Sequence, residues 1–478
     1  MAKYKKQFKI AVPECSIKYL SKAIENEPPT FEFEIESFYG IIYDISSNLS
    51  KSSKLMTPLS SKILQQKYGE GYRDMLDYLT DKHIIIESRH FTEGNCRKFG
   101  FPNSDKELKK MLTVLIDLNT SFGRYVKNRH NKEQKTAKWK AEHIKILRKE
   151  FYDMKFDTDL AIEELNSIKE SLTNEQYMAI YGDILSLSKG NSIQRFFGRN
   201  ETNYRIDSNI TSLKSYFKKF IIDTYQLYQL DLKNSQPVLF NIILNLIIKV
   251  INLEVDVNSS TSTLFYGDKV LKRLVIESGK GFEKNQKLVG ALINEIEEYR
   301  LHTSNGTWYE HLSEVYNLFY ETKYFDRDRA KSMWMALAYS SNHSKNYNVV
   351  KKAFEEKYPC IGKIMRKFKN TKHSELAVIL QKIESNIFID QISLELIGNN
   401  IVPITIHDSI IIKESQQVES QIIMNNVLAR NLGFTPIIQV ENLNDLEFKP
   451  KYTPLDIADE VQQLHLIRNA RRLKKSCI

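Results

Sequence analysis

The segment that decides the fold is IVPITIHDSIIIKE, at residues 401–414. Two runs of β-branched residues flank the polar triplet His407, Asp408 and Ser409. Such runs predict two buried strands that meet in a hairpin with Asp408 at its tip. A lone carboxylate in so apolar a setting is costly unless a cation or a metal ion neutralises it. Asp408 is therefore predicted to be a functional residue.

A second carboxylate stands upstream, in TYQLYQLDLKNSQPVLF at residues 224–240. Apolar residues lead into Asp231, and a helix is predicted to begin near Gln236 and Pro237, because proline is tolerated in the first helical turn. A carboxylate at the end of a strand can hold a divalent cation beside a bound triphosphate. Taken alone, Asp231 is more often an ordinary cap or turn residue.

Residues 327–342 read RDRAKSMWMALAYSSN and place a charged, thioether or phenol side chain at every fourth position from 327 to 339. The four are Arg327, Lys331, Met335 and Tyr339. On a helix they form one stripe roughly 18 Å long: two cations, a thioether and a phenol. That order suits a nucleoside triphosphate, with charge at the phosphate end and flat or apolar groups at the base end. An amphipathic helix with a mixed outer face would give the same pattern.

The three segments, in this order, resemble motifs A, B and C of the family A DNA polymerases. The second is especially similar to the phage-type single-subunit RNA polymerases, which also have a methionine at the third position of the stripe. The resemblance covers about residues 200–445. Arg205 lies where the family has an arginine-containing loop near the template, and Gln381 lies where it has a glutamine-bearing helix.

The resemblance implies an α/β fold: a right-hand polymerase palm with an antiparallel sheet, and helical fingers and thumb. It implies that Asp231 and Asp408, with the backbone of Leu232, bind two Mg²⁺ ions, with Mn²⁺ as the alternative. One ion would activate the primer 3′-hydroxyl, and the other would stabilise the leaving pyrophosphate. The implied partners are a nucleic-acid template-primer and nucleoside triphosphates.

Roles for the stripe follow from the same resemblance. Lys331 would contact the triphosphate and could protonate the pyrophosphate, which makes it the third catalytic residue beside the two carboxylates. Arg327 would steady the same phosphates. Met335 and Tyr339 would lie toward the sugar and base, and His407 would contact the primer end.

The sequence gives conflicting indications of whether the incoming nucleotide carries ribose or deoxyribose. Gln236 takes the place of a glutamate that crowds a ribose 2′-hydroxyl in the DNA polymerases of the family. Ser340 replaces the usual glycine of motif B, and Ser409 follows the aspartate as in the RNA polymerases. The segment between Lys331 and Asp408 is too short for a promoter-reading insertion, so DNA synthesis is favoured. A single-subunit RNA polymerase and an untemplated nucleotidyltransferase remain as alternatives, as does a non-catalytic winged-helix replication protein.

The N-terminal part has its own pattern. PLSSKILQQKYG and EGYRDMLDYLTDK predict two helices, the second with Tyr72, Met75, Leu76 and Leu79 on one face. HIIIESRHF and RKFGF predict strands around a turn at residues 94–95. Helix, helix and hairpin in this order are typical of a winged helix, although a small α+β unit that only packs would look the same.

The composition agrees with a protein that binds a polyanion. The chain has 478 residues and a net charge of +10, which favours nucleic acid or an anionic membrane as a partner. The longest apolar stretch, residues 238–253, is broken by polar residues at helical spacing, so no membrane span is expected. Between residues 123 and 150 lysines and arginines greatly outnumber glutamates, which suits a phosphate backbone or a solvated helix face.

The expected domains follow from these patterns. They are an N-terminal extension (1–50), a winged-helix-like domain (51–105), a helical thumb-like region (106–199), palm segments (200–320 and 386–450), fingers (321–385) and a basic C-terminal tail (451–478). Four widely spaced cysteines and no apolar leader among the first ten residues predict free thiols and a cytoplasmic location. The oligomeric state is left open.

Overall fold

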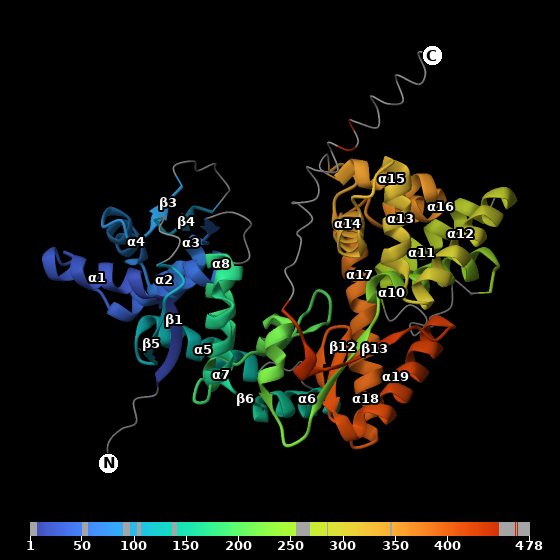
Figure 1. Cartoon of the computed structure of the whole chain (residues 1–478). Coiled ribbons are helices and arrows are strands. Elements are labelled where there is room, and N and C mark those ends of the chain that lie inside the picture. Colours follow the sequence, from blue (N-terminus) through green and yellow to red (C-terminus); the bar gives the residue numbers. More distant parts are fainter. Residues whose placement is uncertain are drawn as a thin grey trace. The chain divides into compact units, whose positions relative to one another are not determined.

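The computed structural model divides the chain into two compact units (Figure 1). It describes residues 7–49, 56–88, 96–102, 107–135, 141–254, 268–283, 285–344 and 347–448, and residues 464 and 466. Unit 1 comprises Met1–Gly198 and Asp207–Thr224, and unit 2 comprises Arg199–Ile206 and Tyr225–Ile478. The fold is mixed α/β, rich in helices, with small antiparallel sheets. Among the described helices, none has the length and hydropathy needed to span a bilayer.

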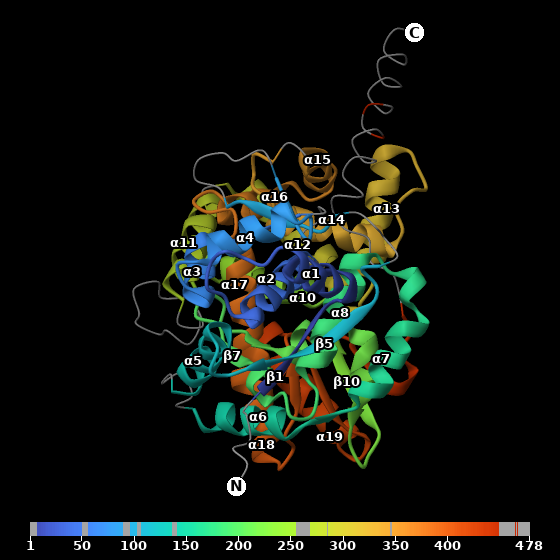
Figure 2. The same ribbon diagram turned by 90° about the vertical axis from the view of Figure 1, so that its left-hand side faces the viewer.

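Unit 1 has a core around a two-stranded antiparallel sheet. Strand β1 (Gln7–Pro13) pairs along its whole length with β5 (Met111–Asp117), and the two lie side by side in both views (Figures 1 and 2). Helices α2 (Ile35–Leu49) and α8 (Asn174–Ser186) pack against β1. Residues expected as an N-terminal extension therefore contribute a strand and two helices, β1, α1 (Glu14–Asn26) and α2, to this core.

The predicted helix, helix and hairpin follow in unit 1 as β2 (Thr57–Pro58), α3 (Ser61–Tyr68), α4 (Tyr72–Asp81), β3 (Ile86–Glu87) and β4 (Lys98–Gly100). The strands form one antiparallel sheet in the order β2-β4-β3. The buried residues of α4 are the four expected on one face: Tyr72, Met75, Leu76 and Leu79. The two helices and two strands are confirmed, while the expected turn at residues 94–95 lies outside the described residues.

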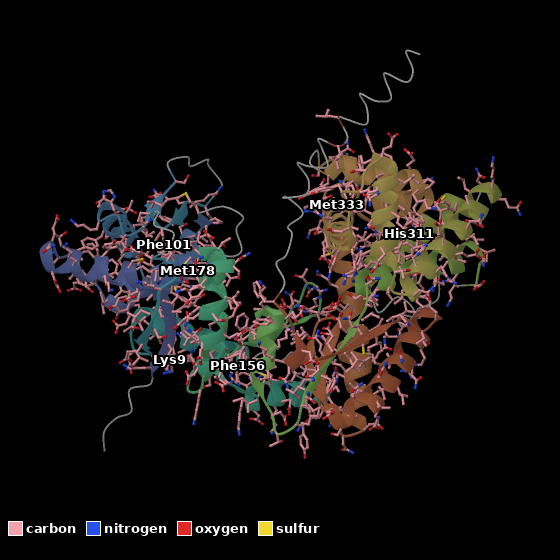
Figure 3. The ribbon with its side chains drawn as sticks, viewed as in Figure 1. Lys9, Phe101, Phe156, Met178, His311 and Met333 are labelled. Atoms are coloured by element: carbon pink, nitrogen blue, oxygen red, sulfur yellow. The ribbon has the colours of Figure 1, made fainter. Side chains whose placement is uncertain are left out.

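The other elements of this part of the chain are mostly helical. They are α1 (Glu14–Asn26), α5 (Ser121–Lys135), α6 (Glu142–Asp153), β6 (Lys155–Phe156), α7 (Thr158–Ser167), η2 (Lys169–Ser171), η3 (Ser192–Gln194), β7 (Phe197–Arg199), β8 (Ile206–Ser208), α9 (Asn209–Ser212), η4 (Ser215–Phe220) and β9 (Ile221–Ile222). Strand β6 pairs with β9, and Phe101 and Met178 lie in the core (Figure 3). Residues 136–140 of the basic stretch and most of the expected basic tail lie outside the described residues.

Unit 2 is organised around a four-stranded antiparallel sheet in the order β11-β12-β10-β13. Its strands are β10 (Leu227–Leu232), β11 (Ile404–Ile406), β12 (Ser409–Lys413) and β13 (Ile438–Asn442). The β-branched runs flanking Asp408 become β11 and β12, so the predicted hairpin is confirmed. One face of β10 and β12 joins the large core of the unit.

Helices account for the rest of unit 2. They are α10 (Ser235–Ile251), α11 (Lys269–Glu283), α12 (Gln286–Ser304), α13 (Trp308–Tyr320), α14 (Arg327–Tyr339), α15 (Asn348–Lys357), α16 (Pro359–Phe368), α17 (Glu375–Ser385), the π-helix η6 (Asn386–Ile392), α18 (Ser393–Gly398), η7 (Glu414–Gln416), α19 (Gln417–Leu432) and η8 (Leu443–Asp445). The expected helix start near Gln236 is confirmed, and α10 is almost wholly buried.

An aromatic cluster packs against helix α14, which carries the stripe. Trp308 of α13 lies 4.4 Å from Tyr299 and 5.5 Å from Trp334 between ring centroids. All three side chains are fully buried. Rings of this size dominate the energetics of a core. Because Trp334 belongs to α14, the cluster fixes one face of that helix and leaves the other for the stripe; His311 and Met333 mark this region in Figure 3.

The described cysteines, Cys15, Cys96 and Cys360, are free thiols. Cys477 lies outside the described residues. The prediction of free thiols is confirmed for these three cysteines.

One buried arginine secures the end of helix α6 in unit 1. The guanidinium of Arg195 donates from Nη1 to the carbonyl oxygens of Phe151, Tyr152 and Met154, at 3.2, 3.0 and 2.8 Å. Its Nη2 donates to the carbonyl of Leu187 at 2.9 Å. The last carbonyls of a helix have no partner within the helix, so a cation placed there satisfies them.

Replacing Arg195 by methionine should destabilise unit 1 by about 3 kcal/mol or more, because buried carbonyls lose their donor. Urea unfolding monitored by circular dichroism measures the change. Lys189→Met, at an exposed position nearby in sequence, is the control and should stay within about 0.5 kcal/mol of the wild type. Equal effects of the two substitutions would contradict the assignment.

Candidate active site

The hairpin that carries Asp408 has a two-residue turn. Ile406 pairs with Ser409, so His407 and Asp408 form the loop between β11 and β12. The backbone of His407 has a φ of 49°, in the left-handed region that favours glycine and asparagine. The Ser409 hydroxyl donates to the Ile406 carbonyl at 3.1 Å and closes the turn. The tight turn presents Asp408 at the end of the sheet.

The sheet brings the two predicted carboxylates to neighbouring positions. In the pairing of β10 with β12, Asp231 lies opposite Ser409, the residue that follows Asp408. The backbone N–H of Leu232 donates to the carbonyl oxygen of Asp408 at 3.2 Å. Both aspartates are half-buried. Residues far apart in the chain therefore meet at one end of two central strands.

Tyr309 of α13 lies within the electric field of both carboxylates. Burial is the main reason that its pKa is raised, and Tyr339, Asp408 and Asp231 raise it further. Arg327 acts in the opposite direction. Tyr309 therefore stays a neutral phenol beside two acidic groups, where it can donate a hydrogen bond.

Asp408 is also held by the start of helix α10. The hydroxyl of Ser235, the first residue of the helix, donates to Oδ2 of Asp408. Asn234 precedes the helix with a φ of 58°, which turns the chain sharply after β10. The N-terminus of a helix carries partial positive charge, which attracts a nearby anionic group.

The four stripe residues share the less buried face of α14. Arg327, Met335 and Tyr339 are half-buried and Lys331 is exposed, while the opposite face is packed into the core. Arg327 Nε donates to Oε1 of Glu310 at 3.0 Å. The predicted helix and its stripe are thus present in the structure.

Tyr309 links this stripe to the carboxylates. The guanidinium carbon of Arg327 lies 5.6 Å from the centroid of the Tyr309 ring. Nζ of Lys331 lies 6.0 Å from the same centroid. The pKa of Tyr309 is also influenced by Asp231 and Asp408, so the end of the stripe that carries Arg327 and Lys331 lies near the acidic end of the sheet.

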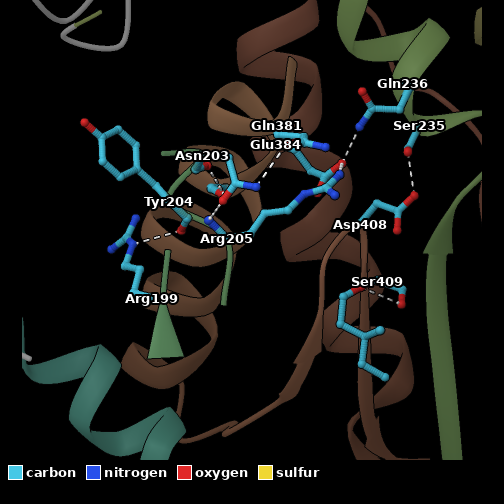
Figure 4. Close-up of polar contacts among 12 residues, drawn as sticks. Arg199, Asn203, Tyr204, Arg205, Ser235, Gln236, Gln381, Glu384, Asp408 and Ser409 are labelled. Carbon is cyan, nitrogen blue, oxygen red and sulfur yellow. Dashed lines mark hydrogen bonds and ion pairs between the residues drawn. The ribbon is translucent and has the colours of Figure 1, made fainter. Parts of the chain in front are cut away.

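A buried carboxylate connects three further predicted segments (Figure 4). Glu384 of α17 is only 1% exposed. Arg205 reaches it with Nη2 at 2.8 Å from Oε2 and Nε at 2.7 Å from Oε1. Gln236 donates its Nε2 hydrogen to the same Oε2. Burial raises the pKa of Glu384 to about 7 against the lowering effect of Arg205, and Asp408 adds a smaller increase.

The predicted loop of Arg205 and the predicted helix of Gln381 also meet directly. Asn203 donates its Nδ2 hydrogen to Oε1 of Gln381 at 3.0 Å, and the Ser385 hydroxyl donates to the Asn203 carbonyl at 3.1 Å. Figure 4 shows Asn203 and Gln381 joined by the first of these contacts. The loop and helix are therefore fixed beside Glu384.

The donor set at the end of the sheet fits a hard divalent cation. Asp231 and Asp408, at neighbouring positions of paired strands, offer carboxylate oxygens. Such oxygens are the ligands that Mg²⁺ prefers. The hydrogen bond from Ser235 leaves the other oxygen of Asp408 available for such a role.

Three residues of this arrangement are not named by the motifs. Glu384 lies three residues after Gln381 on the same helix, and Ser235 directly precedes Gln236, so their proximity to motif residues was a usable signal. Tyr309 belongs to a helix with no motif, and nothing in the sequence singles it out. Only the packing of α13 against α14 brings it to the site.

A separate cluster of Glu298, His302 and His311 has candidate metal-ligand atoms within 4.8 Å of one another. The two imidazole rings stack at 3.8 Å with planes 12° apart, so their nitrogen lone pairs do not converge. Lys357 already pairs with Glu298 at 2.7 Å, and His311 Nε2 lies 2.6 Å from the Tyr358 hydroxyl. Burial and the neighbouring His302 lower the pKa of His311 to about 4. These contacts fit a packing role.

Comparisons with known proteins give little. No protein-family model matches the chain, and no curated protein matches it. Among solved structures, it aligns with the POL domain of Pol1 from M. smegmatis in complex with a DNA primer-template and dNTP, at 14% identity and a TM-score of 0.24. The alignment covers 66% of this chain and 63% of that one, less than two thirds of its length. A function must be argued from this chain's own residues.

The raised pKa of Glu384 predicts a pH-dependent stability. Between the ordinary value of 4.5 and about 7, the folded protein holds a proton that the unfolded chain releases. The stabilisation from that proton is complete below pH 4.5 and is lost as the pH rises through 7. Thermal unfolding of the wild type and Glu384→Gln between pH 5 and 8.5 should therefore show the wild type losing stability relative to the variant. A constant difference would contradict the prediction.

Proposed function

We propose that the chain is a template-directed nucleic-acid polymerase that adds nucleoside triphosphates to a 3′-hydroxyl. The observation that carries the proposal is the meeting of Asp231 and Asp408 at one end of β10 and β12, despite their separation in the chain. A reaction that uses two metal ions about 3.5–4 Å apart needs two carboxylates close to one another. A non-catalytic DNA-binding protein has no such requirement.

Asp231 and Asp408, with the backbone carbonyl of Leu232, would hold two Mg²⁺ ions, or Mn²⁺ in their place. Bound there, the ions would supply positive charge for the 3′-hydroxyl and for the leaving pyrophosphate. The hydrogen bond from Ser235 would hold Asp408 in one rotamer at the start of helix α10. In this proposal the protein positions the two carboxylates so that both can bind the metal ions.

The stripe on α14 would bind the nucleotide. Lys331 and Arg327 would contact the triphosphate, and Lys331 would donate a proton to the pyrophosphate as it leaves. Tyr309, neutral and close to both cations, would donate a hydrogen bond to a phosphate oxygen. Met335 and Tyr339 would lie against the sugar and base, at the other end of the stripe.

The remaining contacts would position template and primer. Arg205 and Gln381 belong to a loop and a helix that are fixed to one another beside Glu384. His407, at the tip of the hairpin, would contact the primer end. In this proposal the four-stranded sheet is the palm and α14 belongs to the fingers.

Unit 1 would supply the contacts to nucleic acid outside the catalytic centre. The sheet order β2-β4-β3 with helices α3 and α4 has the connectivity expected of a winged helix. We assign residues 51–105 to such a domain and the helices that follow, in residues 106–199, to a thumb. Both assignments are supported by element order and by the basic character of the chain.

In this proposal Gln236 decides whether the site accepts nucleotides with deoxyribose or with ribose. Its amide hydrogen is donated to Glu384, and its side chain is 8% exposed. Its Oε1 is buried with no hydrogen-bond partner within the described residues. A side chain held in this way cannot swing aside for a 2′-hydroxyl, so steric exclusion and DNA synthesis are favoured. RNA synthesis, in which Oε1 accepts from the 2′-hydroxyl, and untemplated addition are the alternatives.

Asp408→Asn should lower nucleotide incorporation at least about a thousandfold and leave DNA binding within about twofold, since metal binding needs the charge and DNA affinity comes from lysines and arginines. Primer extension with dNTPs and rNTPs, with and without template, measures the first effect. Fluorescence anisotropy with a labelled primer-template measures the second.

The matched control is Asp445→Asn, an exposed aspartate of η8, which should behave as the wild type. Unchanged incorporation by Asp408→Asn would remove this residue from the site. A parallel loss of binding and incorporation would indicate misfolding, and the proposal would then rest on the equivalent test of Asp231→Asn. Incorporation without template would favour the untemplated enzyme.

Gln236→Ala should raise kcat/KM for ATP relative to dATP by about tenfold, because truncation opens the space beneath the sugar. Steady-state primer extension with each nucleotide gives the ratio, and the dATP value serves as the internal control for folding. If the wild type already prefers ATP and the alanine variant loses that preference, Gln236 recognises ribose and the enzyme makes RNA.

A further inference from the structure

A second basic site lies on unit 1, among residues that the proposed catalytic reaction does not use. A cavity of about 370 Å³ is lined by residues of α5, α6 and η3. Its lining comprises three cations, one carboxylate, two aromatic rings and a hydroxyl: Lys145, Arg148, Lys149, Asp153, His130, Tyr152 and Ser192. Three cations and two aromatic rings in one hollow make a candidate site for an anionic ligand with a flat group.

The spacing of these residues on α6 explains why they converge. Lys145, Arg148, Lys149 and Tyr152 stand at positions i, i+3, i+4 and i+7, which share one helix face. The neighbouring face of α6 is packed into the protein through Ile144, Leu147 and Phe151. His130 lines the hollow from α5. The basic face of α6 is therefore a wall of the cavity.

The aromatic part of the cavity is held in place. The Tyr152 hydroxyl donates to the Arg195 carbonyl at 3.1 Å, and Arg195 itself secures the end of α6. The His130 ring meets the Tyr152 ring nearly at right angles, with centroids 6.4 Å apart. The guanidinium carbon of Arg148 lies 5.1 Å from the Tyr152 centroid. A fixed phenol next to an arginine offers a base a surface for stacking.

The lysines of this face have partners that a phosphate can replace. Lys145 pairs with Glu142 at 2.8 Å, and Lys149 pairs with Asp153 at 2.7 Å. In both pairs the side chains are largely exposed, and exposed pairs of this kind contribute little. A dianionic phosphate next to Arg148 would gain charge-assisted hydrogen bonds from several donors at once.

We propose that this cavity binds the 5′-phosphorylated end of a nucleic-acid strand. The terminal phosphate would lie on Arg148 and Lys149, and the terminal base would stack on Tyr152. The cavity is larger than a single phosphate needs, which leaves space for the attached nucleoside. A terminal monoester carries more charge than an internal diester, and so it matches the cluster of cations better. The site stands independently of the proposed polymerase activity.

The test measures equilibrium binding of the full chain to a short labelled single strand, with a 5′-phosphate or a 5′-hydroxyl. Anisotropy is recorded at fixed salt without divalent cations or nucleoside triphosphates, so failure of the polymerase proposal cannot affect the result. We expect the phosphorylated strand to bind about tenfold more tightly. Two variants, Arg148→Gln and Lys149→Gln, should each reduce this preference; residue 149 is exposed. Both variants should still bind the 5′-hydroxyl strand weakly.

The charge-matched control is Lys127→Gln, an exposed residue of α5 that does not line the cavity. It should keep the full preference for the phosphorylated strand. Equal affinity of the wild type for both strands would overturn the proposal, as would a preference that survives both cavity variants. Competition by free dAMP as strong as that by the phosphorylated strand would assign the cavity to a mononucleotide and overturn the strand-end assignment.

Discussion

The candidate site depends on the register between strands β10 and β12. Side chains alternate along a strand, so a slip by one residue would move Asp231 from the functional face to the core face. The register is fixed because Leu230 and Ile410, which lie opposite one another, are both fully buried in the core of unit 2. The hydrophobic pairing that stabilises the sheet is therefore the same constraint that sets the two acidic side chains beside each other.

Electrostatics add a second layer around this sheet. Glu384 is a carboxylate buried close to Asp408, and removing a charge from water costs far more than one exposed ion pair returns. Arg205 and Gln236 offset that cost with hydrogen bonds from two separate segments. A pKa near 7 means that the protonation state of this network responds to changes near neutral pH. A cation bound at Asp408 would instead oppose this rise in the pKa of Glu384.

The sequence predicted the local structure well wherever periodicity was strong. The hairpin around Asp408, the helix from Arg327 to Tyr339 and the buried face of α4 follow from β-branched runs and from spacings of three and four residues. The roles of the site residues in catalysis stay predictions. Long-range packing was not accessible from the sequence. No spacing reveals that Tyr309 lies beside Arg327 and Lys331, or that Glu384 joins two distant segments.

The end of helix α14 shows how a departure from a motif can be accommodated. Ser340 stands where the motif that this helix resembles has glycine. Its φ of −78° and ψ of 153° suit any residue, so the backbone needs no glycine here. Lys369, 4% exposed, donates to the carbonyls of Leu337 and Ser340 at 2.6 and 3.3 Å. Lys351 donates to the carbonyl of Ser341. Two buried cations thus hold the end of the helix and the orientation of its last residue, a constraint that a glycine hinge would not provide.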